Sequence, residues 1–146
     1  SDYYRDYDDY HNPTNVRLVR FADILLMYAE SIVQSGGTVA DAAKYVDRVR
    51  ARVSMPPLSK NNSAALGSPD LFLKRLQTER ALELATEGQR LADIKRWGLL
   101  DNQAGIDELK SRDADFNGFK IGKHNCLPIP SDEVKNNANI VQNPNY

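Results

Sequence analysis

The chain has 146 residues, of which 41% are hydrophobic, and this is enough for one ordinary domain with a core that needs no disulfides. Its 19 basic and 20 acidic residues nearly cancel, and no basic cluster is present, which argues against a nucleic-acid partner. No apolar run approaches the length of a membrane span, and Cys126, the single cysteine, excludes an internal disulfide.

Residues 1–16 carry no helical apolar stripe, and we expect an extended or irregular arm there. Four tyrosines lie among the acidic side chains of this arm: Tyr3, Tyr4, Tyr7 and Tyr10. A polar arm cannot bury four aromatic rings, so these tyrosines are the best candidates in the chain for stacking on a sugar. They would serve equally well as anchors for an arm that crosses a helical core.

Two helices are predicted next, joined by a short turn at Gly36 and Gly37. The first ends near Ser35 and has an inward stripe of Leu18, Phe21, Ala22, Leu25, Tyr28, Ala29 and Ile32. Thr38 caps the second, which Pro56 and Pro57 stop. Its inner face is predicted to be Ala42, Ala43, Val46, Val49 and Val53. The alanines allow close approach, so the pair resembles a tetratricopeptide-type hairpin.

The following segment is predicted to be a polar loop over residues 54–68, and a third helix then runs from Ser68, Pro69 and Asp70 to about Thr86. Gly88 either breaks this helix or lets two helices pack closely. An apolar stripe continues afterwards through Leu91, Ile94, Trp97 and Leu100. Beyond Gly105 we expect helical turns over 107–112, a turn over 116–119 and a short helix capped at 131–133.

These elements predict a mostly α fold with little strand. We expect tetratricopeptide-like helical hairpins, an irregular N-terminal arm and a tail rich in proline and asparagine. The predicted organisation is one domain over residues 1–146, made of an extended arm (1–16), helical repeats (17–100) and an irregular tail with short helices (101–146).

Residues 79–97 place charge where a helix would ordinarily bury apolar side chains. At helical spacing the acids follow Phe72 and Leu76 along roughly one face. If that face is buried, each carboxylate needs a cation or donor beside it, because an unpaired buried charge costs several kcal/mol. We therefore predict a structural charge network of Glu79, Arg80, Glu83, Glu87, Arg90, Asp93 and Arg96, with the three arginines as the partners of the acids.

The same run resembles the helix signature of the SusD/RagB family, through Glu79-Arg80-x-x-Glu83-Leu84-x-x-Glu87-Gly88-x-Arg90-x-x-Asp93-x-x-Arg96-Trp97. Upstream, residues 19–30 are similar to another helix of that family, and Val49-Arg50-Ala51-Arg52 follows it after a helical spacer. Downstream, Leu127-Pro128-Ile129-Pro130 and Gln142-Asn143-Pro144-Asn145-Tyr146 resemble its closing motifs. Three ordered matches are far more specific than any one of them, although Phe21, Asp23, Ser31 and Asn145 depart from the usual residues.

The resemblance implies that the chain is the C-terminal part of a larger protein, because family members are typically several times longer. It implies a non-catalytic, glycan-binding subunit without a cofactor, which sits on a TonB-dependent, SusC-like transporter and passes it oligosaccharides. It also implies a surface position on the outer membrane, with the lipidated N-terminus lying outside this chain. The part in hand would be mainly scaffold and transporter-facing.

Two other functions remain open from the residues alone. A free-standing helical-repeat module would bind a protein or peptide through a concave apolar groove. A fragment of a glycoside hydrolase would use a pair of acids, such as Glu79 with Glu83 or Glu87 with Asp93. Interleaved arginines argue against the enzyme, because they lower carboxylate pKa values, whereas a general acid needs its pKa raised.

The remaining chemically distinctive residues favour structural roles. His11 and His124 lack the neighbouring ligands of a zinc site, so we expect no metal and a local hydrogen-bonding role for each histidine. Trp97 falls on the apolar stripe of its helix and is predicted to pack rather than to stack on a sugar. No nucleophile motif or phosphate-binding glycine loop occurs.

Overall fold

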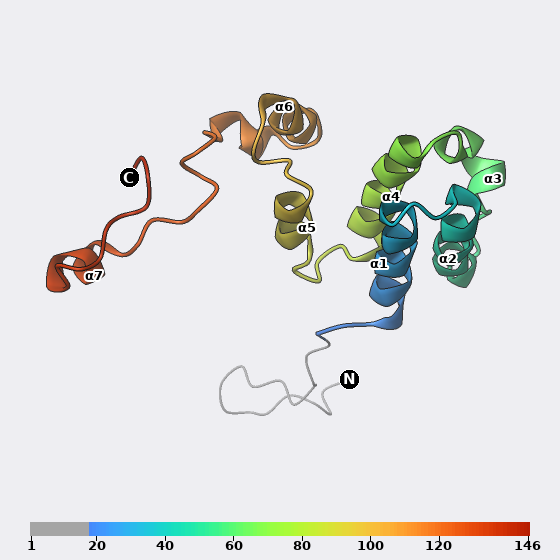
Figure 1. Cartoon of the computed structure of the whole chain (residues 1–146), viewed down its shortest axis with the longest axis horizontal. Coiled ribbons are helices and arrows are strands. Elements are labelled where there is room, and N and C mark those ends of the chain that lie inside the picture. Colours follow the sequence, from blue (N-terminus) through green and yellow to red (C-terminus); the bar gives the residue numbers. More distant parts are fainter. Residues whose placement is uncertain (1–17) are drawn as a thin grey trace, which may run out of the picture. The chain divides into compact units, whose positions relative to one another are not determined.

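The computed structural model describes residues 18–146, and these fall into two compact units, residues 18–85 and 86–146 (Figure 1). Helices and loops make up both units, and no strand occurs among the described residues. The predicted mostly α fold is therefore confirmed. The arm that was predicted for residues 1–16, with its four tyrosines and His11, lies outside the described residues.

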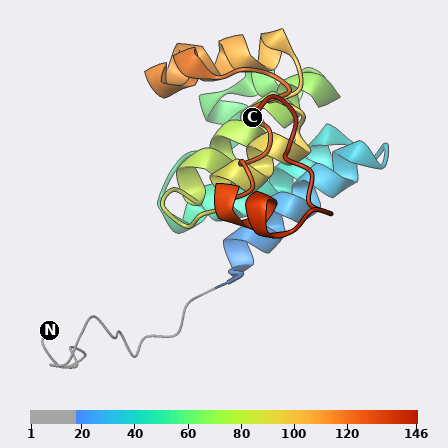
Figure 2. The ribbon, with the colours of Figure 1, turned by 90° about the vertical axis from the view of Figure 1, so that its left-hand side faces the viewer.

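The first unit is built on a hairpin of α1 (Phe21–Gln34) and α2 (Val39–Arg52) (Figure 2). Gly36 takes a positive φ of 84°, and the N–H of Gly37 donates to the carbonyl of Ile32 at 2.7 Å, which ends α1 with a left-handed turn. Thr38 accepts the backbone N–H of Asp41 at 3.1 Å and so caps α2. Both local predictions, the glycine turn and the threonine cap, are confirmed.

Helix α4 (Pro69–Glu83) completes this unit by packing against both helices of the hairpin. Ser68 accepts the N–H of Leu71 at 3.2 Å and Pro69 occupies the first turn, as predicted. The first half of α4 contributes Phe72 and Leu76 to a core whose fully buried members also include Leu26, Ala29, Ala42 and Val46. The small alanines let α1 and α2 approach closely.

The predicted inward stripe of α1 is partly wrong. Leu18, Phe21 and Tyr28 are 79%, 64% and 51% exposed, whereas Leu26 and Val33 are buried in their place. Helix α1 is apolar around most of its circumference, so the periodicity alone does not select the buried side. Val53 is also exposed, because α2 has already ended at Arg52 before the two prolines.

The predicted polar loop over residues 54–68 is also wrong, since it contains α3 (Leu58–Asn61) and the 3-10 helix η2 (Ser63–Leu66). Leu58 is fully buried in the core, and its N–H donates to the Asp47 carboxylate at 2.8 Å. Single apolar residues between polar ones produce no helical hydrophobic period, so these two short helices could not be predicted from the sequence.

The second unit contains α5 (Arg90–Arg96), α6 (Gln103–Arg112), the 3-10 helix η3 (Ala114–Gly118) and α7 (Ser131–Asn136). Helix α4 ends at Glu83 rather than at Thr86, and Gly88, with a φ of 77°, lies in the turn before α5. A small core gathers Ile94, Leu100, Ile106 and Leu109. Leu91, predicted on the same stripe, is 60% exposed.

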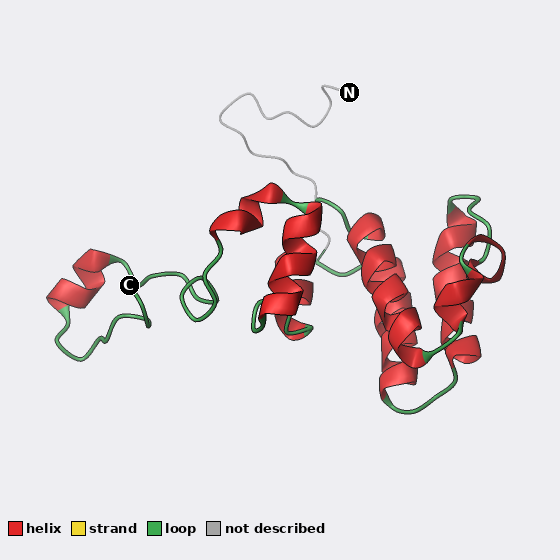
Figure 3. Cartoon of the chain, turned by 90° about the horizontal axis from the view of Figure 1, so that it is seen from above, coloured by secondary structure: helices red, strands yellow, loops and turns green. Residues whose placement is uncertain are grey.

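The C-terminal tail is mostly loop, with α7 as its one helix after η3 (Figure 3). Side-chain amides hold the loop together. Gln142 makes two hydrogen bonds of 2.8 Å to the backbone of Ile129, and Asn143 donates to the carbonyl of Leu127 at 2.6 Å. The two closing sequence motifs therefore bind one another. Residues 131–133 were predicted to cap α7, but they form its first turn, and no side chain caps the helix.

Gly105 is expected to be required for the second unit. A Cβ at this position would lie 2.3 Å from the carbonyl oxygen of Leu99, and backbone would have to move to accommodate it. We predict that Gly105→Ala lowers the free energy of unfolding in urea by about 1–3 kcal/mol. Gly118→Ala is the control, because a Cβ there meets nothing within 4 Å. Equal stability of the two variants would contradict the prediction.

Candidate functional site

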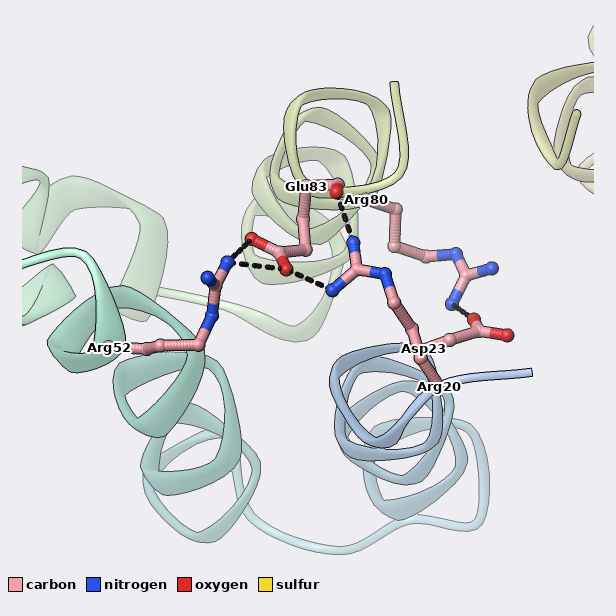
Figure 4. A network of polar contacts seen from close by, with 5 residues as sticks. All are labelled: Arg20, Asp23, Arg52, Arg80 and Glu83. Carbon is pink, nitrogen blue, oxygen red and sulfur yellow. Dashed lines mark hydrogen bonds and ion pairs between the residues drawn. The ribbon is translucent and has the colours of Figure 1, made fainter. Parts of the chain in front are cut away.

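The carboxylate of Glu83 joins all three long helices of the first unit (Figure 4). Arg20, at the start of α1, places Nη1 2.5 Å from Oε1 of Glu83, and its Nη2 donates to the backbone carbonyl of the same residue. Arg52, at the end of α2, donates from Nη2 to both carboxylate oxygens at 2.8 and 2.9 Å. Glu83, the last residue of α4, is thus held by two guanidinium groups, one from each of the other helices.

A second ion pair, also drawn in Figure 4, joins α1 to α4 in the interior. Nη1 of Arg80 donates to Oδ1 of Asp23 at 2.8 Å, and the two side chains are only 3% and 8% exposed. Both charges are removed from water, and burying an isolated ion in the protein interior costs several kcal/mol. Their mutual contact is what allows them to be buried.

The third contact joins α2 to α4 through Arg50, whose side chain is 1% exposed. Its Nε donates to the carbonyl of Pro56 at 2.8 Å, and its Nη1 lies 2.5 Å from Oε1 of Glu79. Arg75, one turn earlier on α4, also donates to Oε1 of Glu79 from Nε at 2.8 Å and from Nη2. Glu79 therefore accepts from two arginines, one local and one from the neighbouring helix.

Most of these partners were missed by the sequence prediction. It paired the acids with Arg80, Arg90 and Arg96. In the structure Glu83 instead accepts hydrogen bonds from Arg20 and Arg52. Glu79 accepts them from Arg50 and Arg75. Arg80 has a partner that was not anticipated, Asp23. Three of the missed arginines stand in the upstream motif segments, but nothing in one sequence links them to acids 29 to 63 residues away.

The charges after α4 belong to the second unit and do not continue the helical face that the sequence predicted. Glu87 lies exposed in the turn between α4 and α5. Asp93 accepts from Nε of Arg96 at 2.8 Å, within α5. The guanidinium groups of Arg90 and Arg96 lie 6.0 and 4.7 Å from the centre of the half-buried Trp97 ring.

Arg90 begins α5 in a partly enclosed position. Burial lowers the pKa of its guanidinium from the usual value, and the positive charge of Arg112 lowers the pKa further. The carboxylates of Asp93 and Glu108 act in the opposite direction. Within the described part of the chain, Nη1 of Arg90 is buried without a hydrogen-bond partner, as is Nη2 of Arg50.

A cavity of about 330 Å³ lies between the C-terminal halves of α2 and α4. Its apolar wall consists of Val49, Val53, Met55 and Leu82, and its polar wall consists of Arg50, Arg52, Glu79 and Glu83. Both carboxylates already accept hydrogen bonds from arginine side chains. The arrangement suits packing or binding, and no hydroxyl or thiol nucleophile lines it.

Two further chemically distinctive side chains, His124 and Cys126, lie in the C-terminal tail. Nδ1 of His124 accepts the N–H of Lys120 at 3.1 Å, which confirms its local hydrogen-bonding role, and Cys126 is exposed. Across residues 18–146, no group of three or more histidine, cysteine or acidic side chains is placed to hold a metal ion. No helix in the described part of the chain has the length and apolar character that crossing a membrane requires.

With this geometry established, comparison with known proteins assigns the chain to a family. Residues 2–146 match the model of the SusD family. The chain belongs to the SusD family. It is 33% identical over 139 residues to SusD-like protein P2 of Formosa agariphila, and 28% identical over 134 residues to starch-binding protein SusD of Bacteroides thetaiotaomicron. No solved structure matches it significantly.

The alignments cover 91% of this chain in both cases. They cover only 26% of the Formosa protein and 22% of the Bacteroides protein, so the chain spans about a quarter of the length of these relatives. The three long helices and their ion pairs are therefore one part of what a SusD-family protein of that length contains.

We predict that the buried carboxylate of Glu79 is necessary for stability. Glu79→Gln leaves Arg50 inside the core without a counter-charge, and the free energy of unfolding should fall by about 3–5 kcal/mol. The matched control is Glu108→Gln. It removes the charge that pairs with Arg112, four residues later, and both of these side chains are partly exposed. That change should cost less than about 1 kcal/mol. Similar urea midpoints for both variants would show that the Glu79 contact is not structural.

Proposed function

We propose that this protein is a non-catalytic, glycan-binding component of a TonB-dependent nutrient-uptake system of the outer membrane. Membership of the SusD family over residues 2–146 carries the proposal. The name of the Bacteroides relative, starch-binding protein SusD, supports a carbohydrate as the ligand class. Its partner would be a SusC-like transporter, and a lipidated N-terminus outside this chain would anchor it at the cell surface.

The absence of catalysis is supported by how the acids of the charge network are used. A glycoside hydrolase needs one carboxyl group whose pKa is raised, so that it can protonate the leaving oxygen. Glu79, Glu83 and Asp93 each accept a hydrogen bond from arginine instead. Glu79 and Glu83 hold helices together, and Asp93 pairs with Arg96 within α5.

The described units are proposed to act mainly as scaffold and to face the transporter. The buried ion pairs of the first unit, such as Asp23 with Arg80, join its helices to one another. Sugar binding by this chain then depends on the tyrosines within residues 1–16, Tyr3, Tyr4, Tyr7 and Tyr10. Aromatic faces provide most of the contact area that a neutral, well-hydrated sugar offers.

We predict weak or absent glycan binding by this chain alone, and dependence of any such binding on the arm. In titration calorimetry with starch-type, plant and host oligosaccharides, Tyr7→Ala combined with Tyr10→Ala should reduce affinity at least about tenfold. Leu91→Ala, an exposed change in the second unit, is the control and should bind unchanged. Tight binding that survives the tyrosine changes would place the site elsewhere in the chain.

We also predict that the chain does not hydrolyse these glycans. Incubation of the chain with the panel should release no reducing ends above those in a protein-free sample. Turnover that Glu83→Gln or Asp93→Asn abolishes, with the fold retained by circular dichroism, would favour the hydrolase instead. Capture of a SusC-like transporter from outer-membrane extracts by the tagged longer protein tests the partner separately.

A further inference from the structure

The cavity between the C-terminal halves of α2 and α4 has a buried floor and an exposed rim. Its volume of about 330 Å³ is at the lower end of the range for small-molecule pockets. Val49, at the floor, is 4% exposed, whereas Val53, Met55 and Leu82 are 49%, 41% and 66% exposed. An aliphatic group that entered the cavity would therefore remove exposed apolar side chains from water, which favours binding.

A buried donor without an acceptor belongs to the same cavity. Arg50 lines the cavity, and its side chain is only 1% exposed. Its Nε donates to the carbonyl of Pro56, and its Nη1 donates to the carboxylate of Glu79. Its Nη2 is buried and has no hydrogen-bond partner among the described residues. Buried polar groups are nearly always hydrogen-bonded in folded proteins, so a bound oxygen atom would satisfy this N–H group.

Positive charge is in excess around the cavity. Four guanidinium groups contact its two carboxylates, Glu79 and Glu83: those of Arg20, Arg50, Arg52 and Arg75. Three arginines still face the two acids when Arg20 is left out of the count. Arg52 lies at the rim, is 58% exposed, and donates to Glu83 from Nη2 (Figure 4). An anionic group beside Arg52 would therefore complement the local charge.

We propose that this cavity binds a small organic carboxylate, which consists of one carboxylate group on a short aliphatic body. Arg50 and Arg52 would donate to the carboxylate oxygens, because guanidinium groups match carboxylates in charge and geometry. The body would lie against the apolar wall of Val53, Met55 and Leu82. The proposal goes beyond glycan binding and does not depend on it.

Other classes of small molecule match only part of the cavity. A neutral aliphatic molecule would cover the apolar wall but leave the excess positive charge unmatched. A hydrophilic anion such as inorganic phosphate would match the charge but leave the apolar wall exposed. None of the described residues that line the cavity is aromatic, so the face of a sugar ring would have no aromatic side chain on which to stack.

Chemical-shift titrations of the ¹⁵N-labelled chain test the proposal. Hexanoate should bind at least about tenfold more tightly than hexanamide, which has the same body without the charge. From butanoate to hexanoate, each added methylene should raise the affinity about threefold. The perturbed amides should cluster at residues 49–55 and 79–83. Equal affinities for hexanoate and hexanamide would overturn the proposal. Absence of binding by every probe would also overturn it, because the cavity would then hold only solvent.

Two exposed residues of the rim allow the site to be located by substitution. Leu82→Trp fills the mouth of the cavity and should weaken hexanoate binding at least about tenfold. Leu91→Trp, at a similarly exposed leucine of the second unit, is the control and should bind within about twofold of the unchanged chain. Unchanged binding by Leu82→Trp, with its fold confirmed by circular dichroism, would place the ligand elsewhere and overturn the proposal.

The charge preference tests Arg52 separately from the fold. Arg52→Gln should abolish the preference for hexanoate over hexanamide, and Arg52→Lys should restore part of it. Arg48→Gln, exposed on α2 outside the cavity, is the control and should keep the full preference. A preference that survives Arg52→Gln would contradict the proposed contact.

The end of a polypeptide carries a similar carboxylate, and a further pair of probes separates it from a free acid. N-acetyl-leucine has the carboxylate, the amide and the aliphatic side chain of a peptide C-terminus, whereas 4-methylpentanoate has no amide. The two should bind within about threefold of each other if the ligand is a small organic acid. Binding of N-acetyl-leucine that is at least about tenfold tighter would overturn the small acid and identify a polypeptide terminus.

Discussion

Burial of arginine–carboxylate pairs between helices is the constraint on which the first unit depends. Asp23 with Arg80 joins α1 to α4, and Arg50 with Glu79 joins α2 to α4. An apolar contact tolerates a slide of one helix past another, because one methyl group replaces another. A buried charge does not, since a shift of one turn would strand it without its partner. The pairs therefore fix the register of three helices that leucine and alanine alone would hold only loosely.

Helix α4 shows how one element meets two requirements. Its first half buries Phe72 and Leu76 in the hydrophobic core, and its second half buries Glu79 and Arg80 instead. The change occurs near the ends of α1 and α2 where Arg20 and Arg52 also meet Glu83. Burial of apolar surface drives the packing of the three helices around the first half of α4. Ion pairs specify how the helices are aligned around its second half.

The sequence predicted best what is encoded within a few residues. The Thr38 cap, the Gly36 turn and the Ser68 cap were all correct, because a capping group and its N–H donor lie within one turn of each other. The buried side of α1 was misjudged because large hydrophobic side chains lie around most of the helix, and the packing of α2 and α4 decides which of them are buried. Glu79 and Glu83 were identified as acids of the network, but Asp23 was not. Arg20 lies 63 residues from Glu83, and no local pattern links the two.

Arg20 also joins the start of α1 to the end of α4. It lies immediately before α1, where it provides no side-chain cap for its own helix, and instead donates to a carbonyl at the end of α4. The last carbonyl groups of a helix lack partners within it, and a cation there is favoured by the helix dipole. The start of α1 and the end of α4 are thereby fastened together. Because Arg20 is 25% and Arg52 is 58% exposed, this contact adds less stability than the buried pairs, and its main effect is geometric.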